Sequence, residues 1–533
     1  MKFKNAAIFS FTLALALTSF GVAKDDENDG NENGAAQWQV AGQNLQNTRS
    51  APNNNRINSG NVTSLHPAWV FTTGGDVSAT PTVAGDAIYF PDWAGNLYAV
   101  NRKTGAAIWS HQISEYDQVP GAIARVSPAI HGNDLIIGDI QNSGAPHAGA
   151  SVMAINRQTG VLEWITQVDS HPAAVITGSP VFLDDVAYVG VSSSEESLAT
   201  NPAYPCCSFR GSMVALDIKT GKILWQTFMV PDNNGRPDGY SGAAIWQPPA
   251  LDPARGSLYV GTGNNYEVPQ DVKNCIAAAP MSAQPACLAA DDHYDSAMAL
   301  DLKTGAIKWS KRVQGLDVWT LACISNPNPV ACPEPSSPDF DLSGSGPNLL
   351  DHMVGFGQKS GLYWAFNPDN GAVLWSSMVG PGATLGGIEW GTATDGKRIY
   401  VAIANGAHKP YPLIDGSSTT GGAWSALDAM TGKILWQTAD PTGAIDTGAV
   451  SVAGDVLFAP SYSGNMNALD ARTGKTLWTF ASGGSVIDGP SIAGGTVYWG
   501  SGYQHIPPGT GNNKVYAFEV AGDGNGGDND GKN

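Results

Sequence analysis

The stretch from Val214 to Trp225, VALDIKTGKILW, contains the pattern that decides the fold. It starts with apolar residues, passes through an aspartate and a Thr-Gly pair, and ends on a tryptophan four residues after the glycine. This order predicts a strand, a tight turn in which the glycine supplies backbone freedom, and a second strand that carries a large ring.

The same phrase recurs along the chain with its local spacing kept. In all seven copies the glycine stands four residues before the tryptophan, whereas successive copies are 42 to 84 residues apart. Constant local spacing with variable separation predicts one structural unit that carries loops of different length. The copies end at Trp109, Trp164, Trp225, Trp309, Trp375, Trp436 and Trp478.

Segments of alternating apolar residues fill the space between the copies. Examples are ATPTVAGDAIYF at 79–90 and GPSIAGGTVYWG at 489–500, which are typical of two strands joined at Gly-Asp or Gly-Gly. Together with the phrase, they make four strands per unit, the composition of a propeller blade.

The two ends of the chain supply the remaining blade. Trp69 lies in a strand-like segment without a preceding Thr-Gly turn, and KVYAFEV at 514–520 supplies a strand without a following tryptophan. Pairing these ends makes an eighth unit and leaves no exposed sheet edge. The sequence therefore predicts an all-β, eight-bladed β-propeller over residues 38–520.

The flanking segments differ from the repeats. Residues 1–23 contain Lys2 and Lys4, a short apolar run and a small-residue end, which predict a secretory signal peptide and a periplasmic location. The Asp/Asn/Gly-rich segments 24–37 and 521–533 predict a flexible acidic linker and a flexible tail. No later stretch approaches 18 uninterrupted apolar residues, so we expect no membrane span.

Charge and missing motifs exclude several function classes. The formal net charge is −19, and it becomes −21 when the two lysines of the signal peptide are removed. This acidity argues against nucleic acid and anionic membranes as partners; it can attract a basic protein or only keep the chain soluble. The sequence holds no Cys-x-x-Cys-His for covalent haem and no dinucleotide-binding Gly-x-Gly-x-x-Gly, so we expect neither c-type haem nor a nicotinamide cofactor.

Across residues 38–520, these repeats resemble the quinoprotein alcohol dehydrogenases. The resemblance implies pyrroloquinoline quinone (PQQ) and Ca²⁺ on the propeller axis, with an alcohol oxidised by hydride transfer to the quinone. It also implies a separate soluble cytochrome c as the electron acceptor. Similar blades occur in a cofactor-free outer-membrane assembly scaffold, so a protein-binding or assembly scaffold is the alternative.

The run ITGSPVFLDDVAYVGVSSSE at 176–195 matches, without a gap, the family's run from a quinone-binding threonine to a calcium-binding glutamate. By that match Glu195 would bind Ca²⁺, which prefers hard oxygen ligands. The alternative for Glu195 is an exposed acid at a polar loop tip. The quinone contacts implied by the same run are Thr177, Ser192, Ser193 and Ser194.

Two adjacent cysteines, Cys206 and Cys207, resemble the family's bridge that lies against one face of the quinone. Arg210 follows them, as in the family, and would bind a quinone carboxylate or carbonyl. Most members carry this pair on an earlier blade, and its later position resembles the polyvinyl alcohol dehydrogenase subgroup. The alternative is that each cysteine pairs elsewhere, although the other four have natural short-loop partners. Those partners are Cys275 with Cys287 and Cys323 with Cys332.

The following segments supply further site residues by resemblance. Trp246 stands where the family has a tryptophan under the quinone, and Asn264 stands where it has a calcium-binding asparagine. The segment ADDHYDSAMALD at 290–301 matches the family's catalytic base only with a gap, so Asp291 and Asp292 compete. Either carboxylate would accept the alcohol proton and could also bind Ca²⁺.

Later blades complete the implied site. Lys359 stands where the family binds the ortho carbonyls of the quinone. Glu389 takes the place of an asparagine in many members and is followed by Trp390, so the hydrogen bond implied at this position is in doubt. A late tryptophan near the quinone in some members has no clear counterpart, although Trp424 could fill that space.

The substrate is implied only by the subgroup. The position of the cysteine pair and the insertions around 265–292 and 314–345 resemble polyvinyl alcohol dehydrogenase, whose substrate is a secondary-alcohol polymer. Small alcohols and sugars remain open.

Overall fold

The computed structural model describes most of the chain after the linker. The described residues are 37–521 without 53, 55, 142–148, 326–330 and 333–337. They belong to a compact unit that runs from Ala35 to Asn533. The predicted signal peptide, the linker up to residue 36 and the tail from residue 522 lie outside the described residues.

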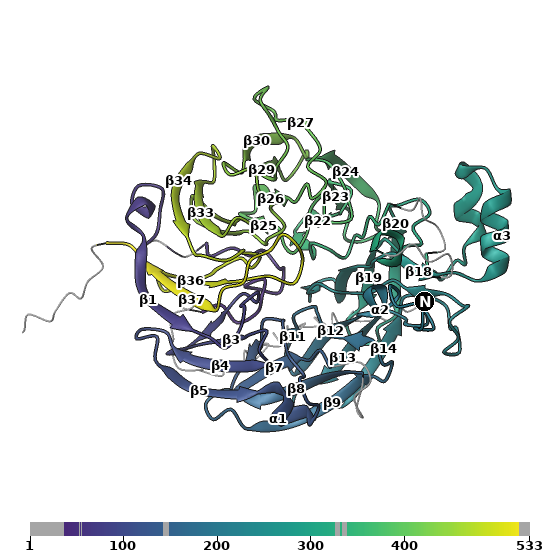
Figure 1. The fold of residues 1–533 in the computed structure, drawn as a ribbon, viewed down its shortest axis with the longest axis horizontal. Coiled ribbons are helices and arrows are strands. Elements are labelled where there is room, and N and C mark those ends of the chain that lie inside the picture. Colours follow the sequence, from purple (N-terminus) through teal and green to yellow (C-terminus); the bar gives the residue numbers. More distant parts are fainter. Residues whose placement is uncertain are drawn as a thin grey trace, which may run out of the picture. The chain divides into compact units, whose positions relative to one another are not determined.

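The described residues form seven four-stranded antiparallel sheets and one five-stranded sheet, which follow one another around a ring (Figure 1). This arrangement confirms the all-β, eight-bladed propeller that the repeats predict. In the last sheet β1 pairs with β37 in a register that places Trp69 opposite Ala517, so the two ends of the chain close the ring as expected.

The strand bounds follow the chain. The first sheet contains β2 (Thr82–Ala84), β3 (Ala87–Pro91), β4 (Asn96–Asn101) and β5 (Ala107–Gln112). The second contains β6 (Ala129–His131), β7 (Asp134–Gly138), β8 (Ala150–Asn156) and β9 (Leu162–Asp169). The third contains β11 (Val181–Leu183), β12 (Val186–Ser193), β13 (Ser212–Asp217) and β14 (Ile223–Phe228), with β10 (Ala174–Val175) also paired to β12. The fourth contains β16 (Ala250–Asp252), β17 (Ser257–Gly261), β19 (Ser296–Asp301) and β20 (Ile307–Arg312).

The second half of the ring repeats this order. The fifth sheet contains β21 (Asn348–Leu350), β22 (Met353–Gly357), β23 (Leu362–Phe366) and β24 (Val373–Met378). The sixth contains β25 (Ala393–Thr394), β26 (Arg398–Ile403), β29 (Ala423–Asp428) and β30 (Ile434–Ala439). The seventh contains β31 (Ser451–Ala453), β32 (Val456–Pro460), β33 (Asn465–Asp470) and β34 (Thr476–Ala481). The eighth contains β35 (Ser491–Ala493), β36 (Thr496–Ser501), β37 (Lys514–Glu519) and β1 (His66–Thr72).

Short elements occupy the loops between strands. Two small sheets pair β15 (Ser241–Gly242) with β18 (Asn265–Glu267) and β27 (Tyr411–Pro412) with β28 (Ser418–Thr419). The helices are η2 (Val62–Ser64), α1 (Ile113–Asp117), α2 (Glu195–Leu198), α3 (Gln270–Ala278), η3 (Met281–Cys287) and α4 (Ala322–Ser325).

Each repeat turn receives the tryptophan of the preceding blade. The indole of Trp164 donates a hydrogen bond of 2.6 Å to the carbonyl oxygen of Ile218. A side-chain carbon on Gly221 would lie 2.5 Å from that ring, and Gly221 has a φ of +70°, so both space and backbone require glycine. Asp217 Oδ1 accepts the amide and hydroxyl hydrogens of Thr220 at 2.9 and 2.7 Å, which closes the turn. One contact between blades thus explains four residue types of the repeat.

The same indole-to-carbonyl bond recurs around the ring. The other donor and acceptor pairs are Trp69–Arg102, Trp109–Arg157, Trp225–Leu302, Trp309–Pro368, Trp436–Ala471 and Trp478–Leu65. The exception is Trp375, whose indole nitrogen finds no partner among the described residues, although its ring still packs on Gly432.

The segment from Trp38 to Ala51 reaches the inner strands of six blades. Its backbone bonds to Val83 of β2 and Val452 of β31, 2.8 to 3.0 Å long. Four more bonds of 2.7 to 3.0 Å link it to Ile130, Leu251, Leu349 and Thr394, of β6, β16, β21 and β25. A segment that bonds to the inner strands of six blades lies at the centre of the ring. We call residues 38–51 the crossing segment.

We expect Gly221→Ala to lower the midpoint of thermal unfolding more than Gly256→Ala does. Gly256 also has a positive φ, +56°, but a side-chain carbon there would have nothing within 4 Å. The control substitution should therefore cost about 1 to 2 kcal/mol of backbone strain. The test substitution should add about 1 to 3 kcal/mol from overpacking against the Trp164 ring. Equal losses for the two variants would contradict this account of the turn.

Candidate functional site

A cavity of about 520 Å³ lies among the loops of several blades. Its wall contains eight residues that the sequence assigns to the cofactor or the metal: Thr177, Ser192, Ser193, Trp246, Asn264, Lys359, Glu389 and Trp390. The structure therefore brings residues more than 200 positions apart in the sequence to one place. The wall also contains residues that the sequence analysis missed, among them Arg125, Glu196, Asp339, Asp341, Tyr503 and His505.

One lysine and several acids make up the charged part of the wall. The ammonium of Lys359 lies 3.0 Å from Asp339 Oδ1 and 2.7 Å from Asp341 Oδ2. Although burial opposes the charge, the neighbouring carboxylates, Asp339 first among them, hold the pKa of Lys359 well above its ordinary value. Burial raises the pKa of Glu196 to about 7, against the opposing pull of Lys359. The acids outnumber the cation beside them.

Several oxygens of this wall have no hydrogen-bond partner among the described residues. Glu196 Oε1 and Asp339 Oδ2 are buried and unpartnered. Asn264 donates its side-chain amide hydrogens to the carbonyls of Asn265 and Trp319 at 2.9 and 2.7 Å, which leaves its own oxygen as an acceptor. Buried carboxylate oxygens without partners are costly unless a cation or a proton satisfies them.

These acids do not form a metal centre by themselves. Within the described part of the chain, no three His, Cys, Asp or Glu side chains are grouped closely enough to hold a metal ion. A cation at this wall would therefore also need the Asn264 amide oxygen and oxygens from a bound molecule. Ca²⁺ accepts such mixed sets of carboxylate, amide and ligand oxygens.

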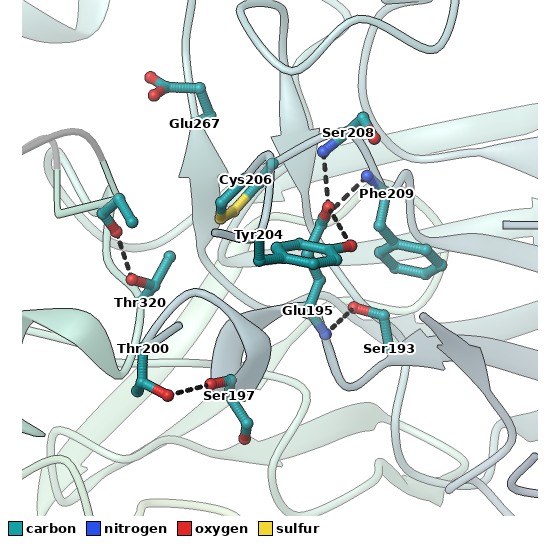
Figure 2. The surroundings of a disulfide bond; sticks show 12 residues. Ser193, Glu195, Ser197, Thr200, Tyr204, Cys206, Ser208, Phe209, Glu267 and Thr320 are labelled. Atoms are coloured by element: carbon teal, nitrogen blue, oxygen red, sulfur yellow. Dashed lines mark hydrogen bonds between the residues drawn. A yellow bond between two sulfur atoms is a disulfide. The ribbon is translucent and has the colours of Figure 1, made fainter. Parts of the chain in front are cut away.

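Glu195 lies away from the cavity wall and anchors a loop (Figure 2). Its Oε1 accepts hydrogen bonds from the Ser208 amide at 2.8 Å and the Tyr204 hydroxyl at 3.1 Å. Its Oε2 accepts one from the Phe209 amide at 2.8 Å. The carboxylate is fully buried, so the alternative of an exposed loop-tip acid is wrong.

The acid on the cavity wall is Glu196, one residue after the acid that the sequence predicts. Helix α2 starts at Glu195, and successive helical side chains point about 100° apart, so only Glu196 faces the cavity. Ser194 is not part of the cavity wall either, and its hydroxyl donates to the Ala173 carbonyl at 3.3 Å. The sequence contains two adjacent glutamates, Glu195 and Glu196. Matching the sequence to the family could not show which of the two side chains faces the cavity.

The loop that Glu195 anchors carries the adjacent cysteines. The structure pairs Cys206 with Cys207, Cys275 with Cys287, and Cys323 with Cys332. Cys206 and Cys207 are buried in a cluster with Tyr266, and Trp246 packs against this cluster. The pair is not itself part of the cavity wall.

Arg210 does not reach the cavity. Its guanidinium donates to the Val230 carbonyl at 3.0 Å, pairs with Asp232 at 3.2 Å and lies over the Phe228 ring. Its predicted contact with a quinone carboxylate therefore has no support in this geometry. The guanidinium on the wall belongs to Arg125, which lies 5.5 Å from the centre of the Trp93 ring.

The two competing candidates for the base also lie off the cavity wall. Asp291 is exposed, and buried Asp292 accepts a 2.9 Å hydrogen bond from Asn265. Burial raises the pKa of Asp292 to about 7. The wall instead contains Asp339 and Asp341, which lie in the insertion predicted at 314–345. The Asp-Phe-Asp triplet at 339–341 was their local signal in the sequence.

Aromatic and apolar side chains line another part of the cavity. Trp390 packs edge-on against Tyr503, with ring centres 5.6 Å apart, and Trp93 stacks on His505 at 3.6 Å. The apolar residues of the wall here include Leu385, Ile506 and Pro507. Trp424 lies in a core cluster with Tyr400 and Trp436 and does not take the predicted place near the cofactor.

Comparison with known proteins decides the family. A family model described as outer membrane protein assembly factor BamB matches residues 30–311 and 420–525. A polyvinylalcohol dehydrogenase of Sphingopyxis sp. (strain 113P3) is 33% identical and matches 86% of this chain and 73% of its own length. One from Pseudomonas sp. is 32% identical, with 88% and 73% covered. The chain belongs to the quinoprotein alcohol dehydrogenase family. The predicted resemblance is confirmed.

Solved structures agree with this quinoprotein fold. The quinohemoprotein alcohol dehydrogenase from Comamonas testosteroni superposes with a TM-score of 0.67 at 18% identity, over 91% of this chain and 80% of that one. A europium-containing methanol dehydrogenase gives a TM-score of 0.64 at 18% identity, over 91% and 98%. BamB from Moraxella catarrhalis gives 0.52 at 16% identity, over 86% and 100%. None of the helices in the described ranges of this chain could span a membrane.

We expect Glu195→Ala and Glu196→Ala to change stability in different ways. Losing Glu195 leaves the buried amides of Ser208 and Phe209 without an acceptor, at about 1 to 3 kcal/mol each. Losing Glu196 removes a buried acid with an unpartnered oxygen, so the midpoint of thermal unfolding of the metal-free protein should stay or rise. The measurement is thermal unfolding in excess chelator. A larger loss for Glu196→Ala would contradict the placement of the two acids.

Proposed function

We propose that this chain is a periplasmic dehydrogenase that oxidises alcohol hydroxyls with bound PQQ and Ca²⁺. The observation that carries the proposal is the acidic cavity wall, with its unpartnered oxygens beside Lys359 and Trp246. Its relatives named polyvinylalcohol dehydrogenase support the reaction class. A cation bound at this wall would satisfy the unpartnered carboxylate oxygens.

The residues present suit a planar, carboxylate-bearing quinone. The indole of Trp246 would pack on the quinone ring. The Lys359 ammonium lies 5.4 Å from the centre of the Trp246 indole. Lys359 and Arg125 would neutralise oxygens of the cofactor. The hydroxyls that would donate to it are those of Thr177, Ser192 and Ser193.

The proposed metal ligands are Glu196 and Asn264, with Asp339 beside them. Two of these side chains have buried oxygens without partners, and the third offers its amide oxygen. When bound, the quinone would accept the hydride while Ca²⁺ polarises its carbonyl.

Asp339 is the proposed acceptor of the alcohol proton. Its Oδ1 is held by Lys359, whereas its Oδ2 is unpartnered and available to a hydroxyl group. Burial raises the pKa of Asp339, whereas the neighbouring Lys359 ammonium lowers it and favours the ionised form that a base needs. Leu385 and Ile506 would cover the carbon chain of the alcohol and exclude water. Asp291 and Asp292 are not proposed further, because neither belongs to the cavity wall.

The finer assignments rest on the relatives and on charge. A secondary-alcohol polymer is the proposed substrate, since the relatives are named for polyvinyl alcohol. A soluble cytochrome c is the proposed acceptor, and the net charge of −19 would attract a basic one.

An assembly scaffold is the second candidate, favoured by the description of the matching family model. Buried acids with unpartnered oxygens have no use in a scaffold and would only destabilise it. The cavity therefore favours the enzyme.

Reconstitution of the metal-free protein with PQQ and Ca²⁺ tests the proposal. We expect dye reduction with polyvinyl alcohol and with small secondary alcohols, and its loss when a chelator removes Ca²⁺. Asp339→Asn should lower kcat by about 100-fold or more. Asp292→Asn, a buried acid off the cavity wall, should retain kcat. A wild-type protein that binds no quinone would refute the enzyme.

A further inference from the structure

The loop at 386–391, GGIEWG, is pressed against the segment that carries Lys359. The Ile388 amide donates to the Gln358 carbonyl at 3.0 Å, and a side-chain carbon on Gly387 would collide with the Lys359 carbonyl. Trp390 has a φ of +37°, a region that residues other than glycine seldom adopt. Such strain persists only where surrounding structure enforces it. The loop therefore holds Glu389 and Trp390 rigidly in the cavity wall.

Glu389 is buried there without an ionic partner. Its side chain is 2% exposed, and its Oε1 has no hydrogen-bond partner in the part of the chain that the structure describes. The nearest cation is Lys359, whose ammonium is already held by Asp339 and Asp341. Within the described residues, no ion pair joins Lys359 to Glu389.

The other charged and titratable groups facing this part of the cavity do not supply a counter-ion. The remaining acids are Asp341, Asp339 and Glu196, and Tyr462 is a further neighbour. Arg125 and His505 also belong to the cavity wall, where Arg125 lies over Trp93 and His505 stacks on that ring.

In the proposed holoenzyme, the positive charges beside the cavity acids are one fewer than the carboxylates. Lys359 and a divalent cation together would balance three of the four carboxylates, those of Glu196, Asp339, Asp341 and Glu389. The cofactor would bring further carboxylates, which Arg125 can only partly offset. Asp339 and Asp341 pair with Lys359, and Glu196 is a proposed metal ligand. Glu389 has neither role, so it is the acid with most reason to stay neutral.

We propose that Glu389 keeps its proton and donates a hydrogen bond from its carboxyl group to an oxygen of the bound quinone. The inference rests on the proposed function and specifies how this acid takes part in cofactor binding. A neutral carboxyl group has the same shape as an amide and, like an amide, can donate one hydrogen bond and accept another.

Burial supports this protonation state. It raises the pKa of Glu389 to about 8, against the opposing effects of Lys359 and the Gly386 amide. A group with this pKa carries its proton at neutral pH and loses it in mildly alkaline solution. Deprotonation would remove the donor and place a further negative charge beside the cofactor, so both effects would weaken binding.

The test measures cofactor binding and not turnover. PQQ is titrated into metal-free protein at saturating Ca²⁺, from about pH 6.5 to about pH 9.5, and binding is followed by quenching of tryptophan fluorescence. We expect the wild-type Kd to stay level up to about pH 8 and then to rise by up to about tenfold per pH unit. Glu389→Gln should bind within about threefold of wild type at about pH 6.5 and show no such rise, because an amide donates at every pH.

Glu267→Gln is the matched control. Glu267 is also a buried glutamate, but it pairs with Lys273 at 2.7 Å and is not part of the cavity wall, so this variant should keep the wild-type profile. A Glu389→Gln variant that loses more than about tenfold in affinity at about pH 6.5 would overturn the inference, since the ionised acid would then be the binding form.

The wild-type profile is decisive even if the variant fails to fold. A Kd unchanged between about pH 6.5 and about pH 9.5 would overturn the inference while leaving the proposed function standing. Wild-type protein that binds no quinone at any pH would overturn both.

Discussion

The propeller depends on one contact made between neighbouring blades. An indole N–H from the outer strand of one blade donates to a turn carbonyl of the next, and its ring packs on a glycine that no larger residue could replace. Each blade alone would leave an apolar face uncovered, so stability comes from this repeated docking. The cavity is a consequence, because blades held at their outer edges leave their inner loops to converge.

The fold could be predicted because the residues that make this contact recur in each repeat at a fixed spacing. Asp217, Thr220, Gly221 and Trp225 belong to a single local unit, and its recurrence reports the number of blades. The sequence also predicts that the chain ends pair to close the ring, because Trp69 and the segment at 514–520 each contain half of a repeat unit. The predicted boundaries of the signal peptide and the tails stay predictions, because these segments lie outside the described residues.

The cavity was predicted less completely, for two physical reasons. A sequence match gives the position of a residue along the backbone but not the direction of its side chain. The sequence therefore predicts Glu195 in the site, whereas the first turn of α2 points Glu196 into the cavity. Asp339 and Asp341 lie in the segment 314–345, which the sequence predicts to be an insertion, so no family position was matched to them. Trp246, Asn264 and Lys359 belong to the wall as expected. Arg125 lies far from the motif that drew attention to Arg210.

The crossing segment has a consequence for the order of folding. The strand β1 pairs with a partner more than 400 residues later, and the side chain of Lys514 bonds to Thr72 across 442 positions. Residues 38–51, near the start of the chain, likewise bond to strands as late as β31. The ring cannot close until the last strand has been synthesised. The first residues of the propeller therefore cannot make their native contacts before the last ones are present. Contacts of such long range slow folding, and they make the nascent chain dependent on protection from aggregation until its synthesis is complete.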